Sequence, residues 1–189
     1  MLVRDFMQRD TTVASLGSTV ESTLDLMKQE SFRVIFVVDG EGGLSGFLTY
    51  NSIADQPGDR PIDDYVSRAN LTVQEDDPVD KAVVLIKDHN LMVLPVVDED
   101  RKLAGILTPG KLFEAFSELL NLGQGGLWIT LTITRTEDLP RVLEVLIERG
   151  VGLQNLIADD QDDELEVVLK VSGIKNSASL EAAISEVIE

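Results

Sequence analysis

The sequence contains no cysteine, a single histidine and about half as many basic as acidic residues. The absence of cysteine excludes disulfide bonds, thiolate zinc sites and cysteine nucleophiles, and it fits a reducing compartment. With 16 Lys and Arg against 34 Asp and Glu, the formal net charge is −18. This charge repels DNA, RNA and anionic membranes, so the sequence predicts no nucleic-acid partner. It also opposes anionic small molecules at long range, so a site for them needs strong local donors.

Long apolar segments are missing as well. Uninterrupted apolar runs are short, such as Val34–Val38, whereas a membrane span needs roughly 20 residues. The opening stretch, MLVRDFMQRD, lacks the apolar core of a signal peptide. We therefore expect a cytoplasmic protein without a membrane partner.

What the sequence does contain is an internal repeat. GFLTYNSI at 46–53 and GILTPGKL at 105–112, called here the first and second octets, have glycine, apolar residues, threonine and a later polar residue at the same positions. The step from Gly46 to Gly105, called here the repeat offset, also relates Val20 to Val79. One residue of slippage is needed to align Val13 with Val73.

Each copy shows the same order of elements, β-α-β-β-α, over about sixty residues. A short β-prone segment precedes a helix, for which Ser18 and Asp77 are the candidate N-caps. Two strands joined by a tight turn follow, and a helix closes the copy, most clearly at 111–121. Two such copies share one core, and a cleft between pseudo-symmetric halves is a common place for a small ligand.

These motifs resemble a pair of CBS (cystathionine β-synthase) motifs over about residues 1–120. LPVVD at 94–98 with the second octet is the strong copy, and IFVVD at 35–39 with the first octet is the weaker one. The resemblance implies a regulatory module that senses adenosine-containing ligands such as AMP, ADP, ATP or S-adenosylmethionine. It also implies a dimer.

In that family the last polar position of the octet is often an aspartate that binds the ribose hydroxyls, and the threonine sits near phosphate. Here Ser52 and Lys111 stand at that position. Serine can bond one hydroxyl, whereas the lysine ammonium is a donor only and can instead meet a phosphate. Capping of the following helix by the threonine and serine is an equally good interpretation. The ligand-binding residues implied by the resemblance are Thr12, Val13, Ile35, Phe36, Thr49, Ser52, Thr72, Val73, Leu94, Pro95, Thr108 and Lys111.

The last third of the sequence changes character after GQGG at 123–126, which is typical of a flexible linker. Alternation over 127–134 predicts a half-buried strand, and a helix follows that ends near Gly150. Two strands then pair across Asp159–Glu164, and a last helix spans 177–188. This order resembles a ferredoxin-like ACT domain, a fold that often senses amino acids.

A CBS pair followed by an ACT-like domain resembles the acetoin-utilisation accessory family. The predicted fold class is α+β, with a CBS pair (1–59 and 60–121), a linker (122–126) and an ACT-like domain (127–189). The usual fourth ACT strand has no clear counterpart, which leaves 127–134 as an edge. We expect another chain to cover this edge, unless the sequence stops short of the missing strand.

No nucleophile–base pair, metal cluster or cofactor fingerprint is apparent, so we predict neither enzymatic activity nor a cofactor. The acidic run DDQDDE at 159–164 lacks the frame of a calcium loop, so we interpret it as a solvated hairpin tip. The favoured hypothesis is a homodimeric regulatory protein that binds an adenine nucleotide between the CBS motifs. Two alternatives stay open, namely a degenerate CBS scaffold without ligand and amino-acid sensing by the ACT-like domain.

Overall fold

The structure is a computed structural model that describes residues 1–161 and 164–188. The chain divides into two compact units, Met1–Ala115 and Phe116–Glu189, and each is described by itself. Both units combine helices with three-stranded sheets, which confirms the α+β class. Within the described residues, no helix has the length and apolar character needed to cross a bilayer.

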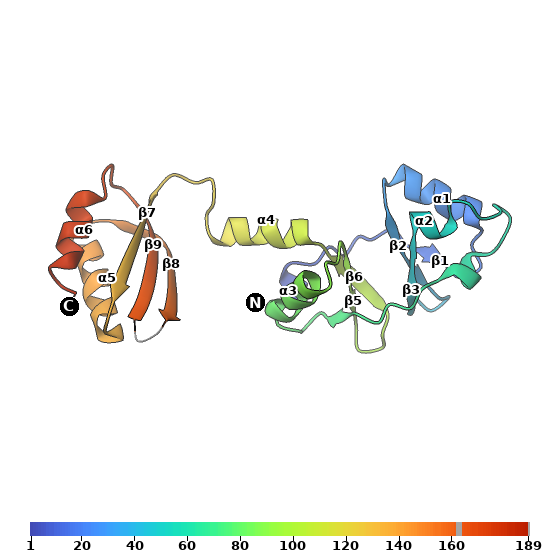
Figure 1. The fold of residues 1–189 in the computed structure, drawn as a ribbon, viewed down its shortest axis with the longest axis horizontal. Coiled ribbons are helices and arrows are strands. Elements are labelled where there is room, and N and C mark those ends of the chain that lie inside the picture. Colours follow the sequence, from blue (N-terminus) through green and yellow to red (C-terminus); the bar gives the residue numbers. More distant parts are fainter. Residues whose placement is uncertain (162–163, 189) are drawn as a thin grey trace. The chain divides into compact units, whose positions relative to one another are not determined.

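The first unit contains the same set of elements twice (Figure 1). In each copy a short strand pairs in parallel with a central strand, which pairs in antiparallel fashion with the third. The first copy comprises η1 (Val3–Asp5), β1 (Ala14–Ser15), α1 (Val20–Gln29), β2 (Val34–Val38), β3 (Leu44–Thr49) and α2 (Tyr50–Ile53). The second comprises η2 (Ile62–Tyr65), β4 (Val73–Gln74), α3 (Val79–Asp88), β5 (Leu94–Val97), β6 (Leu103–Leu107) and α4 (Pro109–Leu119).

Strand register corrects the predicted slippage near Val13. Ala14 of β1 pairs with Val37, and Val73 of β4 pairs with Val96, so equivalent positions keep the repeat offset without interruption. Ala14 and Val73 are both buried. The prediction matched two valines, whereas the fold places a smaller alanine at this core position.

The helix caps also differ from the predicted ones. Thr19, rather than Ser18, caps α1, because its hydroxyl oxygen accepts the N–H of Ser22 at 3.2 Å. Asp77 lies one residue before the N-cap position of α3, which is Pro78. Its carboxylate instead stabilises the preceding turn, where it accepts the N–H of Gln74 at 2.7 Å.

The segment that opens the first copy packs against the second copy. The N–H of Val3 donates to the Asp77 carbonyl at 2.9 Å, just before α3. Further along, Gln8 forms an antiparallel bridge with Ile106 of β6. Residues 2–8 therefore complete the second copy rather than the first.

The segment that opens the second copy makes the matching contacts with the first. The N–H of Ile62 donates to the Ser18 carbonyl at 2.9 Å, and Ser67 bridges Phe47 of β3. Ile62 is fully buried in the core formed by α1 and β2. The two copies thus exchange their opening segments, which ties them into one unit.

This exchange explains the glycine at the start of both octets. A Cβ on Gly46 would lie 2.2 Å from the carbonyl oxygen of Ser67, and one on Gly105 would lie 2.6 Å from that of Gln8. Real Cβ atoms do not approach backbone oxygen so closely. Glycine is required because the exchanged backbone runs directly over these positions.

The second unit is a separate three-stranded antiparallel sheet with the strand order β7-β9-β8. This is the order of a ferredoxin-like sheet without its fourth strand. Helices α5 and α6 lie on one face of the sheet, where they bury β7 and β9 (Figure 1). The elements are β7 (Leu127–Ile133), η3 (Thr136–Asp138), α5 (Leu139–Glu148), β8 (Gly152–Gln161), β9 (Glu164–Ser172) and α6 (Ala178–Ser185).

The hairpin between β8 and β9 is tighter than predicted. Asp159 pairs with Glu166 and Asp160 with Leu165, so the strand continues into the acidic run. Exposed acidic side chains do not prevent the backbone ladder, because only the backbone forms it. Asp162 and Asp163 of the predicted tip lie outside the described residues. In the part of the chain that the structure describes, no cluster of acidic or histidine side chains is arranged to hold a metal ion.

Candidate functional site

Two clefts open between the two copies of the first unit. The larger, the Thr108 cleft, has a volume of about 410 Å³. It is lined by Gln8, Thr11, Thr12, Ser31, Phe32, Arg33, Val34, Ile35, Phe36, Met92, Val93, Ile106 and Thr108. The smaller, the Phe47 cleft, has a volume of about 340 Å³. It is lined by Val34, Phe36, Phe47, Arg68, Ala69, Asn70, Leu71, Asn90, Leu91, Met92, Val93 and Pro95.

The repeat relates the two clefts to each other. The repeat offset matches residues of the Thr108 cleft with residues of the Phe47 cleft, namely Thr12 with Leu71, Arg33 with Met92, Phe36 with Pro95 and Ile106 with Phe47. A hydroxyl and a guanidinium in one cleft are therefore replaced by apolar side chains in the other. The polar groups of the Phe47 cleft come from other positions, namely Arg68, Asn70 and Asn90.

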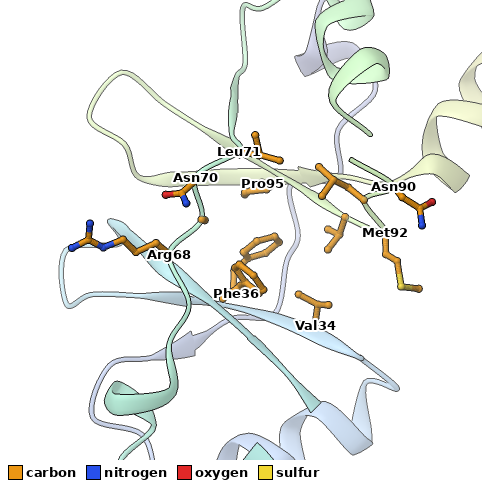
Figure 2. A pocket seen from close by; sticks show the side chains of 12 residues that line it. Val34, Phe36, Arg68, Asn70, Leu71, Asn90, Met92 and Pro95 are labelled. Atoms are coloured by element: carbon orange, nitrogen blue, oxygen red, sulfur yellow. The ribbon is translucent and has the colours of Figure 1, made fainter. Parts of the chain in front are cut away.

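The Phe47 cleft is correspondingly apolar. Figure 2 shows Val34 and Phe36 on one side, facing Leu71 and Pro95 on the other. The guanidinium of Arg68 lies at the rim and extends away from Phe36 (Figure 2). The walls of this cleft suit a flat, uncharged group.

Thr108 lies at the junction of β6 and α4, which places its hydroxyl at a helix N-terminus. Its Oγ1 accepts the N–H of Lys111 at 3.2 Å, as an N-cap does. Accepting this bond leaves the hydroxyl hydrogen free for a second partner, because a hydroxyl both donates and accepts. Arg33 lines the same cleft and adds a positive charge. The pair offers a helix N-terminus and a cation to a negatively charged ligand group.

Thr49 is the counterpart of Thr108, but it makes more hydrogen bonds with the helix that follows it. Its Oγ1 accepts the N–H of Ser52 at 3.2 Å, and the Ser52 hydroxyl donates to the Thr49 carbonyl at 2.7 Å. The Thr49 N–H in turn donates to Ser52 Oγ at 3.2 Å, which completes a capping box. Thr49 lines a neighbouring hollow with Tyr50 and Asn51, not the Phe47 cleft.

Lys111 lies outside both clefts. Its ammonium pairs with Glu114 one turn along α4, at 2.6 Å, on the exposed surface. An ion pair of this kind contributes little to stability, but it turns the ammonium toward solvent. Arg33, and not Lys111, is the basic side chain that lines the Thr108 cleft.

The remaining predicted residues separate into two groups. Those that line a cleft are Thr12, Ile35, Phe36 and Pro95. Ser52, Thr72, Val73 and Leu94 line neither cleft, and Val13 faces a shallow hollow beside α1. Val73 and Leu94 are buried in the core.

The predicted site residues did not include the segment between each first helix and its central strand. This segment supplies Arg33 to the Thr108 cleft, Asn90 to the Phe47 cleft and Met92 to both. The repeat offset relates Arg33 to Met92, so the difference in charge at this position was visible in the sequence. What the sequence did not show is that the segment lines a cleft.

Comparison with known proteins places this arrangement in a family. The model of the CBS domain matches residues 3–57 and again residues 62–118. The chain belongs to the CBS domain family. A CBS domain pair/ACT domain protein from Thermotoga maritima is 29% identical with a TM-score of 0.58, over 64% of this chain and 99% of that one.

Two further relatives are informative. The CBS domain pair of the protein MJ0100, solved in complex with 5′-methylthioadenosine and S-adenosyl-L-methionine, is 25% identical with a TM-score of 0.53. That match covers 62% of this chain and 97% of the other. A homoserine O-acetyltransferase of Methanosarcina acetivorans is 27% identical over 120 residues, or 62% of this chain and 22% of the enzyme. The chain thus spans about a fifth of the length of the first curated relatives.

Proposed function

We propose that this protein is a regulatory sensor that binds an adenosine-containing ligand in the Thr108 cleft. The observation that carries the proposal is the meeting of Thr108, Arg33 and Thr12 on the wall of one cleft between two CBS motifs. The binding of adenosine derivatives by the MJ0100 CBS pair supports the ligand class.

The residues of the cleft suggest which part of the ligand each of them contacts. Ile35, Phe36 and Ile106 supply apolar wall against which a purine base packs. A phosphate or carboxylate of the ligand is placed at the N-terminus of α4, beside Thr108 and Arg33. Among the described residues, no carboxylate side chain lines this cleft to accept the ribose hydroxyls, so recognition rests on the base and the anionic group.

Regulation follows if the ligand prefers one arrangement of the two copies. Both copies contribute to the Thr108 cleft, since Thr12 and Arg33 belong to the first and Thr108 to the second. A ligand that contacts both copies shifts the equilibrium between two arrangements of the copies. The size of the shift is set by the difference in the ligand's affinity for the two arrangements. The protein itself carries out no reaction in this proposal.

Thermal denaturation with a panel of ligands tests the proposal. AMP, ADP, ATP and S-adenosylmethionine are compared, and a ligand at 100 times its Kd stabilises the native state by about 2.7 kcal/mol. Thr108→Val should abolish most of this gain, whereas the matched variant Thr49→Val should preserve it. Loss of the gain in Thr49→Val alone would place the ligand elsewhere.

A degenerate CBS scaffold without ligand is the second candidate. Its support is the engagement of Ser52 in a capping box and of Lys111 in an ion pair, where the family often has aspartates. The same panel decides between the two, because a scaffold is stabilised by none of the ligands.

We assign an ACT-like role to the second unit, in amino-acid sensing or dimerisation. The strand order supports the relationship, and β7 forms an edge with no further strand beside it in the described residues. The sequence of β7, LWITLTI, contains no charge and no proline, the usual guards of an edge strand. We infer that a second copy pairs there, giving a homodimer.

Analytical ultracentrifugation tests pairing through β7. The double variant Thr130→Lys with Thr132→Lys should raise the dimer dissociation constant, and an unchanged constant would refute pairing through β7.

The proposed module limits follow the repeat, with 1–59 and 60–121 as the CBS motifs, 122–126 as linker and 127–189 as the ACT-like domain. We also propose a cytoplasmic location, which the absence of cysteine favours.

A further inference from the structure

Lys170 is a buried cation in the second unit, with only 2% of its surface exposed. Its neighbours on β9, Leu169 and Val171, point into the core beneath α5 and α6. Lys170 therefore lies on the opposite face of the sheet, because side chains alternate along a strand. No carboxylate lies within ion-pair distance of its ammonium among the described residues. A buried lysine without an anionic partner is unusual.

The contacts that Lys170 does make are neutral. Its Nζ donates to the backbone carbonyl of Asn121 and lies 5.3 Å from the centroid of the Trp128 ring. An ammonium carries three N–H groups, so one carbonyl does not satisfy it. An anion would bind the same position more strongly than a carbonyl does.

The amide side chains next to Lys170 also lack partners. Asn155 is the cross-strand partner of Lys170 on β8, and its buried Nδ2 has no acceptor among the described residues. Gln154 lies in the bulge beside it, and its buried Oε1 has no donor there either. A Cβ on Gly126 would lie 2.7 Å from Gln154 Oε1 and 3.3 Å from Lys170 Cε, so the side chains of Gln154 and Lys170 meet beside Gly126. Buried polar atoms without partners are rare and mark a missing partner.

We propose that Lys170, Asn155 and Gln154 form a binding site for a small 2-hydroxycarboxylate, with Trp128 as one wall. Lys170 and the Asn155 amide donate to the carboxylate, which takes the place of the Asn121 carbonyl. Gln154 Oε1 accepts a hydrogen bond from the hydroxyl on the adjacent carbon. An amino acid fits less well, because its ammonium would lie close to that of Lys170.

Access requires the Asn121 carbonyl and the exposed segment 122–126 to move, and this segment contains three glycines. This segment follows directly on Asn121. Binding therefore exchanges a contact between Lys170 and its own chain for one between Lys170 and the ligand. The site is independent of the Thr108 cleft and of the ligand proposed there.

Trp128 is the sole tryptophan of the chain, so its fluorescence reports on this site directly. The full-length protein is titrated with glycolate, acetate, glycine and inorganic phosphate, with sodium chloride as the control for ionic strength. We expect saturable changes in Trp128 emission, with glycolate bound more tightly than acetate and glycine most weakly. Phosphate binding as tightly as glycolate would overturn the assignment to a carboxylate.

Two variants separate the site from a general effect. Lys170→Met and Asn155→Leu should each weaken glycolate binding by about tenfold or more. Thr108→Val should leave it unchanged, so failure here and failure of the nucleotide proposal are distinguishable. If Lys170→Met does not fold, Asn155→Leu alone decides. Equal glycolate affinity in Asn155→Leu and the wild type, or no saturable signal in the wild type, would overturn the proposal.

Discussion

The backbone carbonyl of Gln8 occupies the space that a side chain on Gly105 would need, at 2.6 Å from its Cβ position. The pair joins the opening segment of the first CBS motif to the sheet of the second. Ser67 and Gly46 have the same relationship in the opposite direction, at 2.2 Å. Glycine is therefore required in each octet by the exchange of opening segments between the two motifs, and not by the turn that precedes it.

Gly46→Ala and Gly105→Ala should each destabilise the protein by about 2–4 kcal/mol, because the exchanged strand must shift outward. Gly40→Ala is the matched control, since a Cβ there meets nothing within 4 Å. Urea denaturation of the full chain measures the free energy of unfolding. Equal stability of Gly46→Ala and Gly40→Ala would contradict the close approach.

Asp77 should make stability depend on pH. Burial raises the pKa of its carboxyl group, but hydrogen bonds from Lys81 and from the Gln74 N–H, with the charge of Lys81, outweigh this and lower the pKa below its ordinary value. A lowered folded pKa stabilises the native state above the unfolded pKa of about 3.9, and the gain is lost as pH falls through the folded pKa. Asp77→Asn should thus be less stable than wild type at pH 7. The difference should shrink as pH falls below the unfolded pKa of about 3.9 and through the folded pKa, and a difference that stays constant down to the acid limit of folding would refute the prediction.

Asp39 and Asp98 hold the equivalent turns of the two motifs. Asp39 Oδ1 accepts the N–H groups of Glu41 and Gly43 at 2.9 and 2.8 Å. Asp98 does the same two and four residues on, at 3.0 and 2.8 Å. Alanine at either position should cost about 1–2 kcal/mol of unfolding free energy. Asp55→Ala serves as the surface control in the same denaturation series, and an equal loss there would remove the special role of the turns.

Lys111 and Arg33 should respond differently to the same substitution. Lys111→Met should leave nucleotide affinity within about twofold, because its ammonium pairs with Glu114 outside the cleft. Arg33→Met should reduce affinity, because Arg33 lines the cleft. Isothermal titration of both variants measures this. A larger loss in Lys111→Met would restore the role implied by the family resemblance.

Much of the CBS pair was accessible from the sequence because both copies carry the same apolar pattern. The repeat offset between Gly46 and Gly105 predicted the equivalent strands and the α+β class. The exchange of opening segments was not predictable, because hydrophobic periodicity defines faces of elements but not which copy a short segment joins. For the same reason, the need for glycine at Gly46 and Gly105 became clear only with the fold.

The candidate site was predicted less well than the fold. Thr108, Thr12 and Phe36 line the Thr108 cleft, and their role in ligand binding stays a prediction. Arg33 was passed over because an isolated arginine is most often solvated. Its importance depends on its position in the wall of the Thr108 cleft, which forms only when the two motifs pack together.

Isothermal titration of AMP into wild type, Arg33→Met and Lys111→Met tests the central claim most directly. We predict one site per chain in the wild type, an affinity about tenfold lower in Arg33→Met, and an affinity within about twofold of wild type in Lys111→Met. If no adenosine ligand from the panel gives saturable heat, or if Arg33→Met binds AMP as tightly as the wild type, the Thr108 cleft is not the sensor site.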